Sequence, residues 1–130
     1  MAEVKLVVIY PCPTDVERFE KLFHEEHIPL AIKNFADQTK IVATKVIGYL
    51  DTQAVHRMTE VYFPSFEALN ACTSSPAGQE TIVHAEAIST GGKPIFLVAE
   101  EEVFSMKART PAKKRPRSVR TTFLNGAEKS

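Results

Sequence analysis

Two stretches of this sequence are apolar on both faces of a β-strand, and they constrain the fold more than any other feature. Within residues 3–10, the even-numbered residues from Val4 to Tyr10 are apolar, and so are Val7 and Ile9 between them. Residues 94–99 show the same pattern near the end of the chain. A strand that is apolar on both sides must be covered on both sides. Each face of the sheet therefore needs a covering layer.

The segments between these strands predict the rest of the architecture. Four strands are expected, at Glu3–Tyr10, Lys40–Tyr49, Arg57–Phe63 and Pro94–Ala99. One helix follows Pro13, and two shorter helices begin at Ser65 and Ser75, which are suitable N-cap residues. The resulting order is βαββαβ, the ferredoxin-like arrangement of the α+β class with an antiparallel sheet.

In the ferredoxin-like arrangement the helices cover one face of the sheet and leave the other bare. Here the bare face would carry valine, isoleucine, leucine and phenylalanine, a larger apolar patch than monomers usually expose. We therefore expect a homodimer in which two sheets face each other.

The first helix carries several local signals. Residues 14–17 fit a capping box in which the Thr14 hydroxyl accepts from the Glu17 backbone N–H. Pro29 cannot donate a hydrogen bond to residue 25, which predicts a kink or an end near His27–Ile28. One apolar stripe with helical spacing contains Val16, Phe19, Phe23, His27 and Leu30.

The charges divide the chain at Met106. The net charge of the 130 residues is zero, but residues 1–106 hold eight basic against fifteen acidic residues, and residues 107–130 hold eight against one. The basic tail contains two prolines and few large apolar residues, so we expect it to be flexible. The basic cluster at residues 113–117 could contact nucleic acid. However, Phe123 is the sole aromatic residue of the tail, so the tail offers few side chains on which bases could stack. We therefore expect one domain over 1–106, a solvated tail and no nucleic-acid partner.

Several classes of protein are excluded by what the sequence lacks. Its longest uninterrupted apolar run is too short to span a bilayer, and its N-terminus does not fit a signal peptide. Two cysteines, Cys12 and Cys72, are too few for a disulfide framework. There is no phosphate-binding loop, nucleophile elbow or dinucleotide fingerprint. These features predict a cytoplasmic protein without a membrane partner, whose chemistry would be proton transfer on a small apolar ligand without a cofactor.

His27 is the candidate catalytic residue. It lies in the apolar stripe near the expected helix end, where the helix dipole favours the protonated ring and burial favours the neutral ring. Such opposed effects suit a general acid or base. A structural histidine that bonds a carbonyl freed by Pro29 explains the same pattern.

The candidate ligand-binding residues lie around His27 in the expected pocket between the first helix and the sheet. They are aromatic, namely Phe19, Phe23, Tyr10 and Tyr62. His24 and His27 could share a metal on one helix face, but the sequence offers no recognisable third ligand. We therefore expect no metal, and a solvated His24.

The motifs of the chain resemble those of a known family. Residues 23–30 are similar to the H-x-P-L signature that closes the first helix of EthD-type proteins, and segments 60–63, 66–69, 75–79 and 90–92 match that family's second half in order and spacing. The resemblance covers about residues 3–103 and implies the dimeric α/β barrel. The family's name comes from the degradation of ethyl tert-butyl ether. Relatives with this fold include lyases, cyclases, isomerases, cofactor-free monooxygenases and haem proteins.

Three functions follow as hypotheses. The first is a cofactor-free lyase, cyclase or isomerase in which His27 moves a proton. The second is an accessory protein of a degradation pathway that binds a hydrophobic metabolite without converting it. The third, haem or oxygen chemistry, rests on analogy of fold. A reachable His27 beside a second polar group favours chemistry, whereas a sealed His27 favours packing.

Overall fold

The computed structural model describes residues 3–50 and 54–106, and these residues form one antiparallel sheet with a layer of helices. The strands are β1 (Glu3–Pro11), β2 (Lys40–Lys45), β3 (Val55–Phe63) and β4 (Ile95–Glu101), in the order β2-β3-β1-β4. The helices are α1 (Val16–Leu22), the π-helical turn η1 (Phe23–His27), α2 (Ile28–Asn34), α3 (Phe66–Ser74) and α4 (Pro76–Ile88). The predicted ferredoxin-like α+β fold is confirmed.

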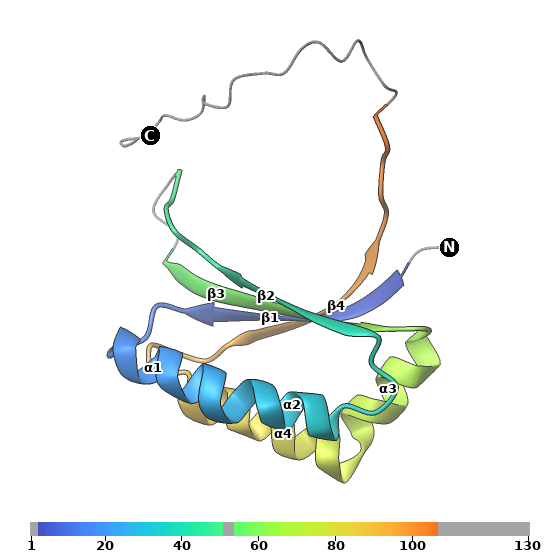
Figure 1. Cartoon of the computed structure of the whole chain (residues 1–130), viewed down its shortest axis with the longest axis horizontal. Coiled ribbons are helices and arrows are strands. Elements are labelled where there is room, and N and C mark those ends of the chain that lie inside the picture. The colour runs from blue at the N-terminus through green and yellow to red at the C-terminus, as the bar shows by residue number, and fades with distance from the viewer. Residues whose placement is uncertain (1–2, 51–53, 107–130) are drawn as a thin grey trace.

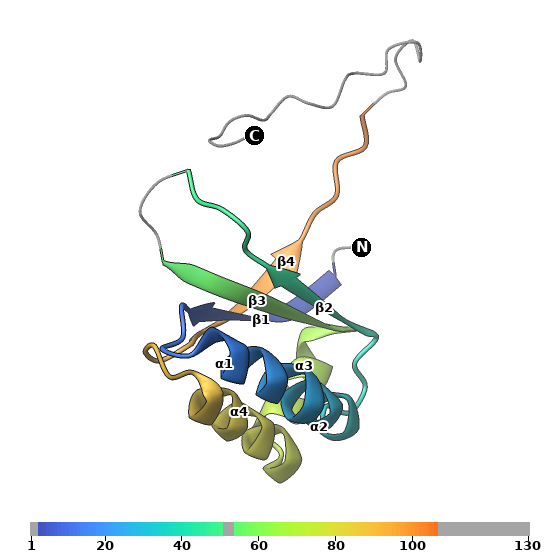
Figure 2. The same ribbon diagram turned by 60° about the vertical axis from the view of Figure 1, so that its left-hand side comes forward.

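All the helices lie on one face of the sheet, and the opposite face has no covering layer from the described part of the chain (Figures 1 and 2). The segments 46–50 and 102–106 leave the ends of β2 and β4 and rise on that open side (Figure 1). No helix in residues 3–50 and 54–106 has the length and apolar character needed to cross a membrane. The basic tail, 107–130, lies outside the described residues.

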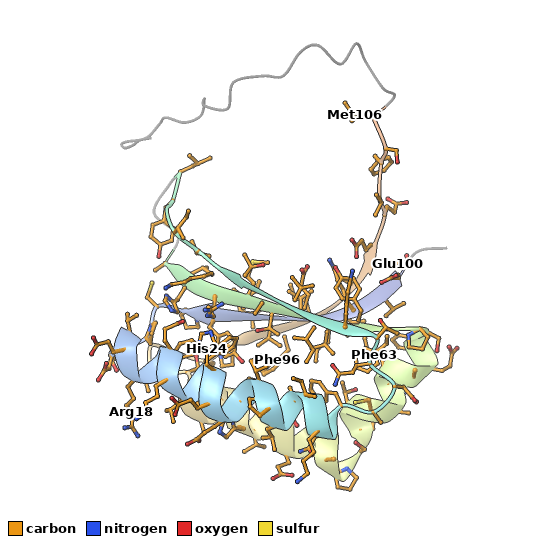
Figure 3. The ribbon with its side chains drawn as sticks, viewed as in Figure 1. Arg18, His24, Phe63, Phe96, Glu100 and Met106 are labelled. Carbon is orange, nitrogen blue, oxygen red and sulfur yellow. The ribbon has the colours of Figure 1, made fainter. Side chains whose placement is uncertain are left out.

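The core lies between the sheet and the helices (Figure 3). The first strand contributes its even-numbered side chains to it, and these pack against aromatic residues of the helix layer. The largest fully buried side chains are Tyr10, Phe19, Phe23, Phe63, Leu69, Val61 and Thr81. The alternation expected for β1 is therefore present, with Leu6, Val8 and Tyr10 facing the helices.

The first helix begins one residue later than the capping box predicts. Its N-cap is Asp15, whose carboxylate accepts from the Arg18 backbone N–H at 3.1 Å. The prediction of Thr14 as the cap is wrong, because the Thr14 backbone N–H is bound to the Thr90 hydroxyl of the loop after α4. That long-range contact fixes Thr14 outside the helix.

The helix does not end at His27–Ile28. In η1 the Ile28 backbone N–H donates to the carbonyl of Phe23, five residues back, and α2 then continues to Asn34. The wider turn directly before Pro29 accommodates both the proline ring and the backbone N–H that proline lacks. The helical segment therefore continues through Pro29.

The π-helical turn also changes which residues are buried. A straight α-helix advances 3.6 residues per turn, so residues four apart drift around its surface. The extra residue in η1 offsets this drift, and the buried positions recur at every fourth residue: Phe19, Phe23, His27, Ala31 and Phe35. Two members of the predicted stripe lie outside the core, since Val16 is 47% exposed and Leu30 is half-buried.

A tight contact joins the loop after α4 to the loop before α1. A Cβ added at Gly91 would lie 1.7 Å from the carbonyl oxygen of Cys12, whereas one added at Gly48 would meet nothing within 4 Å. We expect Gly91→Ala to lower the free energy of unfolding by about 1–3 kcal/mol, because the backbones must separate. Gly48→Ala, the matched control, should stay within about 0.5 kcal/mol of the wild type. Urea denaturation measures both, and equal losses in the two variants would contradict this account of Gly91.

Candidate functional site

The helix layer brings an aromatic cluster against the end of β1. Tyr10 has no exposed surface, and its ring lies edge-on to Phe19 and Phe23, with centroids 5.2 and 5.9 Å away. The ring of Phe23 stacks on that of His27 at 6.1 Å. Four of the predicted site residues, Tyr10, Phe19, Phe23 and His27, therefore lie together.

A chain of polar contacts runs out of this cluster. The Tyr10 hydroxyl lies 3.2 Å from Nε2 of His27, and Nδ1 of His27 lies 2.9 Å from Nδ1 of His84 on α4. Nε2 of His84 lies 3.6 Å from a carboxylate oxygen of Glu26, whose side chain is 60% exposed. The chain thus connects a hydroxyl in the core with a carboxylate in solvent.

One arrangement of protons satisfies every member of this chain. The Tyr10 O–H donates to Nε2 of His27, Nδ1–H of His27 donates to His84, and Nε2–H of His84 faces Glu26. The reverse polarity would leave the Tyr10 O–H without an acceptor among the described residues and would point a lone pair at the carboxylate. The chain therefore has a direction, from core to surface.

Burial keeps both inner groups neutral. It lowers the pKa of His27 from 6.5 to about 4, and the neighbouring His84 acts in the same direction. The helix continues past His27, so no helix end stabilises its charged form. Burial also raises the pKa of Tyr10. At neutral pH His27 is an uncharged imidazole held between a donor and an acceptor.

A second polar cluster, which the sequence analysis missed, lies beside the first. Glu20 on α1 accepts two hydrogen bonds from Arg57, at 2.8 and 2.9 Å, and its carboxylate lies 2.7 Å from Nε2 of His56. Arg57 lowers the pKa of Glu20 to about 2 against the opposing effect of burial, and His56 adds to the lowering. The Arg57 guanidinium lies 4.6 Å from the centre of the Phe23 ring, so this cluster also holds Phe23.

In an ideal strand, His56 and Arg57 would lie on opposite faces of β3, so the sequence alone does not indicate that they meet. The pairing register of β1 with β3 shifts between Tyr10 and Pro11, opposite these residues. An irregularity of this kind turns neighbouring side chains to the same side. His84, by contrast, carried a signal, because it lies three residues after Thr81 and four before Ile88, which are both buried on α4.

An open cavity of about 420 Å³ lies between η1–α2 and β2. Its lining is mostly apolar and comprises Phe23, His24, Ile28, Ile32, Gln38, Thr39, Lys40, Ile41 and Ala43. Phe23 belongs both to this wall and to the aromatic cluster. Phe19 lines a separate groove of about 300 Å³.

Tyr62 does not join the cluster. It pairs with Lys5 across β1 and β3, and its ring lies under the Nζ atoms of Lys5 and Lys40, at 5.3 and 4.5 Å. These side chains occupy the open face of the sheet, opposite the helices. Within residues 3–50 and 54–106 there is also no group of three or more His, Cys, Asp or Glu residues that could hold a metal.

The comparisons with known proteins agree with this fold. The family model described as the EthD domain matches residues 13–87, which include α1, η1 and most of α4. This protein belongs to the EthD family. A search among curated proteins gives no match for it.

Solved structures similar to this EthD-family protein share its fold. An EthD family protein from Bacillus halodurans C-125 is 22% identical with a TM-score of 0.70, and the match covers 77% of this chain and 99% of that one. An EthD-like protein from Ralstonia eutropha JMP134 is 18% identical with a TM-score of 0.58, covering 76% and 91%. A dimeric ferredoxin-like protein of unknown function from Bacteroides fragilis NCTC 9343 is 14% identical with a TM-score of 0.55, covering 76% and 96%.

The buried neutral state of His27 predicts a dependence of stability on pH. The unfolded chain accepts a proton on this histidine near pH 6.5, whereas the folded chain accepts it only near pH 4. Stability should therefore fall as the pH drops through this window, by roughly 3 kcal/mol. Urea denaturation at pH 7 and pH 4 measures the fall.

The fall attributed to His27 should be absent in His27→Gln. The matched control is His24→Gln, because the His24 side chain is 59% exposed and lies on the same turn. The control should retain the pH dependence of the wild type. If His27→Gln and wild type keep parallel profiles, burial is not holding His27 neutral.

Proposed function

We propose that this EthD-family protein binds a small, largely apolar molecule in the cavity between η1–α2 and β2. We also propose that the chain from Tyr10 through His27 to His84 exchanges a proton with that molecule. The reaction class is that of a cofactor-free lyase, cyclase or isomerase. The observation that carries the proposal is the chain itself: two hydrogen bonds join Tyr10, His27 and His84, and His84 faces the exposed carboxylate of Glu26 at 3.6 Å.

The free-energy cost of burying this polar chain supports a functional role for it. Burying polar groups in an apolar core is unfavourable, and the lowered pKa of His27 reflects that cost. Apolar side chains of similar size would fill the same space without it. Perturbed titratable groups beside a cavity are typical of acid–base sites. An exchangeable path to Glu26 would restore the proton after each turnover.

Phe23 connects the cavity with the polar chain. Phe23 is a lining residue of the cavity and its ring stacks on His27, so turning the ring aside would bring a ligand to His27 and Tyr10. The π-helical turn that carries Phe23 and His27 adds support, because such turns occur often at functional sites.

A second candidate function is binding without conversion. It is favoured by the closed state of the cluster, since Phe23 has no exposed surface and His27 is only 4% exposed. In that case the cavity would hold a metabolite while His27 and Tyr10 pack beneath it.

We also propose a homodimer through the open face of the sheet. Ile95 and Leu97 are 54% and 47% exposed there, and a partner would cover them. The polar end of this face is already paired, since Lys5 Nζ lies 2.6 Å from Glu60, which lowers the cost of burying it. The similar protein from Bacteroides fragilis is described as dimeric, in line with this proposal.

We also propose that the protein is cytoplasmic. Both cysteines are free thiols, as is usual in the reducing cytoplasm. The family takes its name from ethyl tert-butyl ether, so a xenobiotic of a degradation pathway is a reasonable first candidate for the ligand.

Mass spectrometry of small molecules released from the purified protein tests the binding proposal. Ala43→Phe should remove the released molecule, because the new ring fills the cavity to which Ala43 belongs. Ala71→Phe, on the exposed side of α3, is the matched control and should retain it. Retention of the molecule in Ala43→Phe would place the binding site elsewhere.

Turnover of the released molecule then separates the two candidate functions. For an enzyme, His27→Asn should retain the ligand and lose about 10²–10⁴-fold in rate. Tyr10→Phe, which removes only the hydroxyl, provides a second variant should His27→Asn fail to fold. If the wild type converts nothing while both variants bind with modestly changed affinity, the protein is a carrier.

Light scattering at micromolar concentration tests the dimer. The wild type should have about twice the chain mass of 14.5 kDa. Leu97→Glu should give a monomer, because it buries a charge in the proposed interface. Val83→Glu, at a position 59% exposed on α4, should leave the dimer intact. A monomeric wild type would overturn the paired-sheet assembly.

A further inference from the structure

His24 is a polar side chain of the cavity lining that takes no part in the chain from Tyr10 to Glu26. It lies on η1 at the rim of the cavity of about 420 Å³, and Figure 3 shows it on the side of the helix that faces the sheet. Its ring is held edge-on to Phe23, with centroids 5.5 Å apart and planes at 85°. The sequence predicts a solvated His24, and its side chain is indeed 59% exposed.

The hydrogen bond of His24 determines what its free nitrogen can do. Nδ1 lies 2.8 Å from the backbone carbonyl oxygen of Glu20. A carbonyl oxygen only accepts, so Nδ1 carries the hydrogen. In the neutral ring, Nε2 then presents a lone pair. None of the hydrogen bonds within residues 3–50 and 54–106 involves this nitrogen.

The contact with Glu20 on α1 fixes the orientation of His24. The Glu20 carboxylate lies 3.8 Å from Nδ1 and is itself held by Arg57 and His56. This contact favours the same tautomer, because it places negative charge beside the N–H. The cluster therefore holds a hydrogen-bond acceptor in place at the rim before a ligand arrives, which reduces the entropy lost on binding.

The other polar side chains of the cavity offer no competing cation. Nε2 of Gln38 donates to the carbonyl oxygens of Ala31 and Ile32, which leaves its own oxygen as an acceptor. Nζ of Lys40 lies over the Tyr62 ring on the far face of the sheet. The cavity thus presents apolar walls, the acceptors of His24 and Gln38, the neutral hydroxyl of Thr39 and no free ammonium group, which disfavours an anionic ligand.

We propose that His24 determines the specificity of the cavity for an apolar molecule that carries one neutral O–H donor, such as an alcohol or a phenol. The ligand's hydroxyl donates to Nε2 of His24 while its hydrocarbon part contacts Ile28, Ile32 and Ile41 of the cavity lining. This inference rests on the proposed function in one respect, that the cavity binds an apolar molecule at all.

Calorimetric titration with three probes that share the naphthalene ring tests the inference. Naphthalene measures apolar binding, 1-naphthol adds a donor, and 1-methoxynaphthalene keeps the oxygen but lacks the donor. We expect 1-naphthol to bind about tenfold more tightly than 1-methoxynaphthalene, which is the effect of one good hydrogen bond. The Nε2 resonance of His24 in a ¹⁵N spectrum should shift with 1-naphthol alone.

Two variants complete the design. His24→Phe keeps a ring at the rim but removes the acceptor, so the preference for 1-naphthol should vanish while naphthalene binds as before. Glu25→Gln, at an exposed position of the same turn outside the cavity lining, is the control and should keep the preference.

The outcomes distinguish this inference from the proposed function. If none of the three probes binds, the proposed cavity function fails and the inference falls with it. If all three bind equally, the cavity function stands and the role of His24 is overturned. A preference for 1-naphthol that persists in His24→Phe also overturns it, because the acceptor would then be another group.

Discussion

The missing backbone donor of Pro29 is the constraint on which the site depends. It is accommodated by one π-helical turn, in which Ile28 bonds to Phe23 five residues back. Without that turn the helix would rotate its later residues away from the sheet. With it, Phe23 and His27 fall on one buried line that continues to Phe35. The stacking of Phe23 on His27 and the contact of His27 with Tyr10 both follow from this alignment.

Two polar clusters share the space between the first helix and the sheet, and they differ in kind. Glu20 and Arg57 form a charged pair with short, direct hydrogen bonds, which suits a fixed support. The other chain has a neutral inner part, Tyr10 and His27, and ends at the exposed carboxylate of Glu26, which suits proton exchange. Phe23 contacts both clusters, because the Arg57 guanidinium lies over its ring and the ring of His27 stacks on it. The support and the exchangeable chain thus meet at the wall of the cavity.

The open face of the sheet accounts for the second apolar face of the first and last strands. The helices cover only the face that carries Leu6 and Val8. On the other face the side chains divide into an apolar part, around Leu97, and a polar part, where Lys5 bonds Glu60. A paired charge tolerates burial far better than a single one. This division fits a surface meant to be covered, and it leaves the cavity beside β2 free on the opposite side of the sheet.

The sequence by itself determined the order of elements, the caps at Ser65 and Ser75, and the burial of Phe19, Phe23 and His27, because these depend on local periodicity and short-range hydrogen bonds. It could not place His84 against His27, since 57 residues separate them and only the packing of α4 brings the rings together. The shift in register between β1 and β3 likewise decided that His56 and Arg57 face Glu20, against the alternation of an ideal strand. Helix spacing and proline chemistry act within a few residues, whereas partners of a buried polar group are chosen by tertiary packing, and that is where the candidate site was decided.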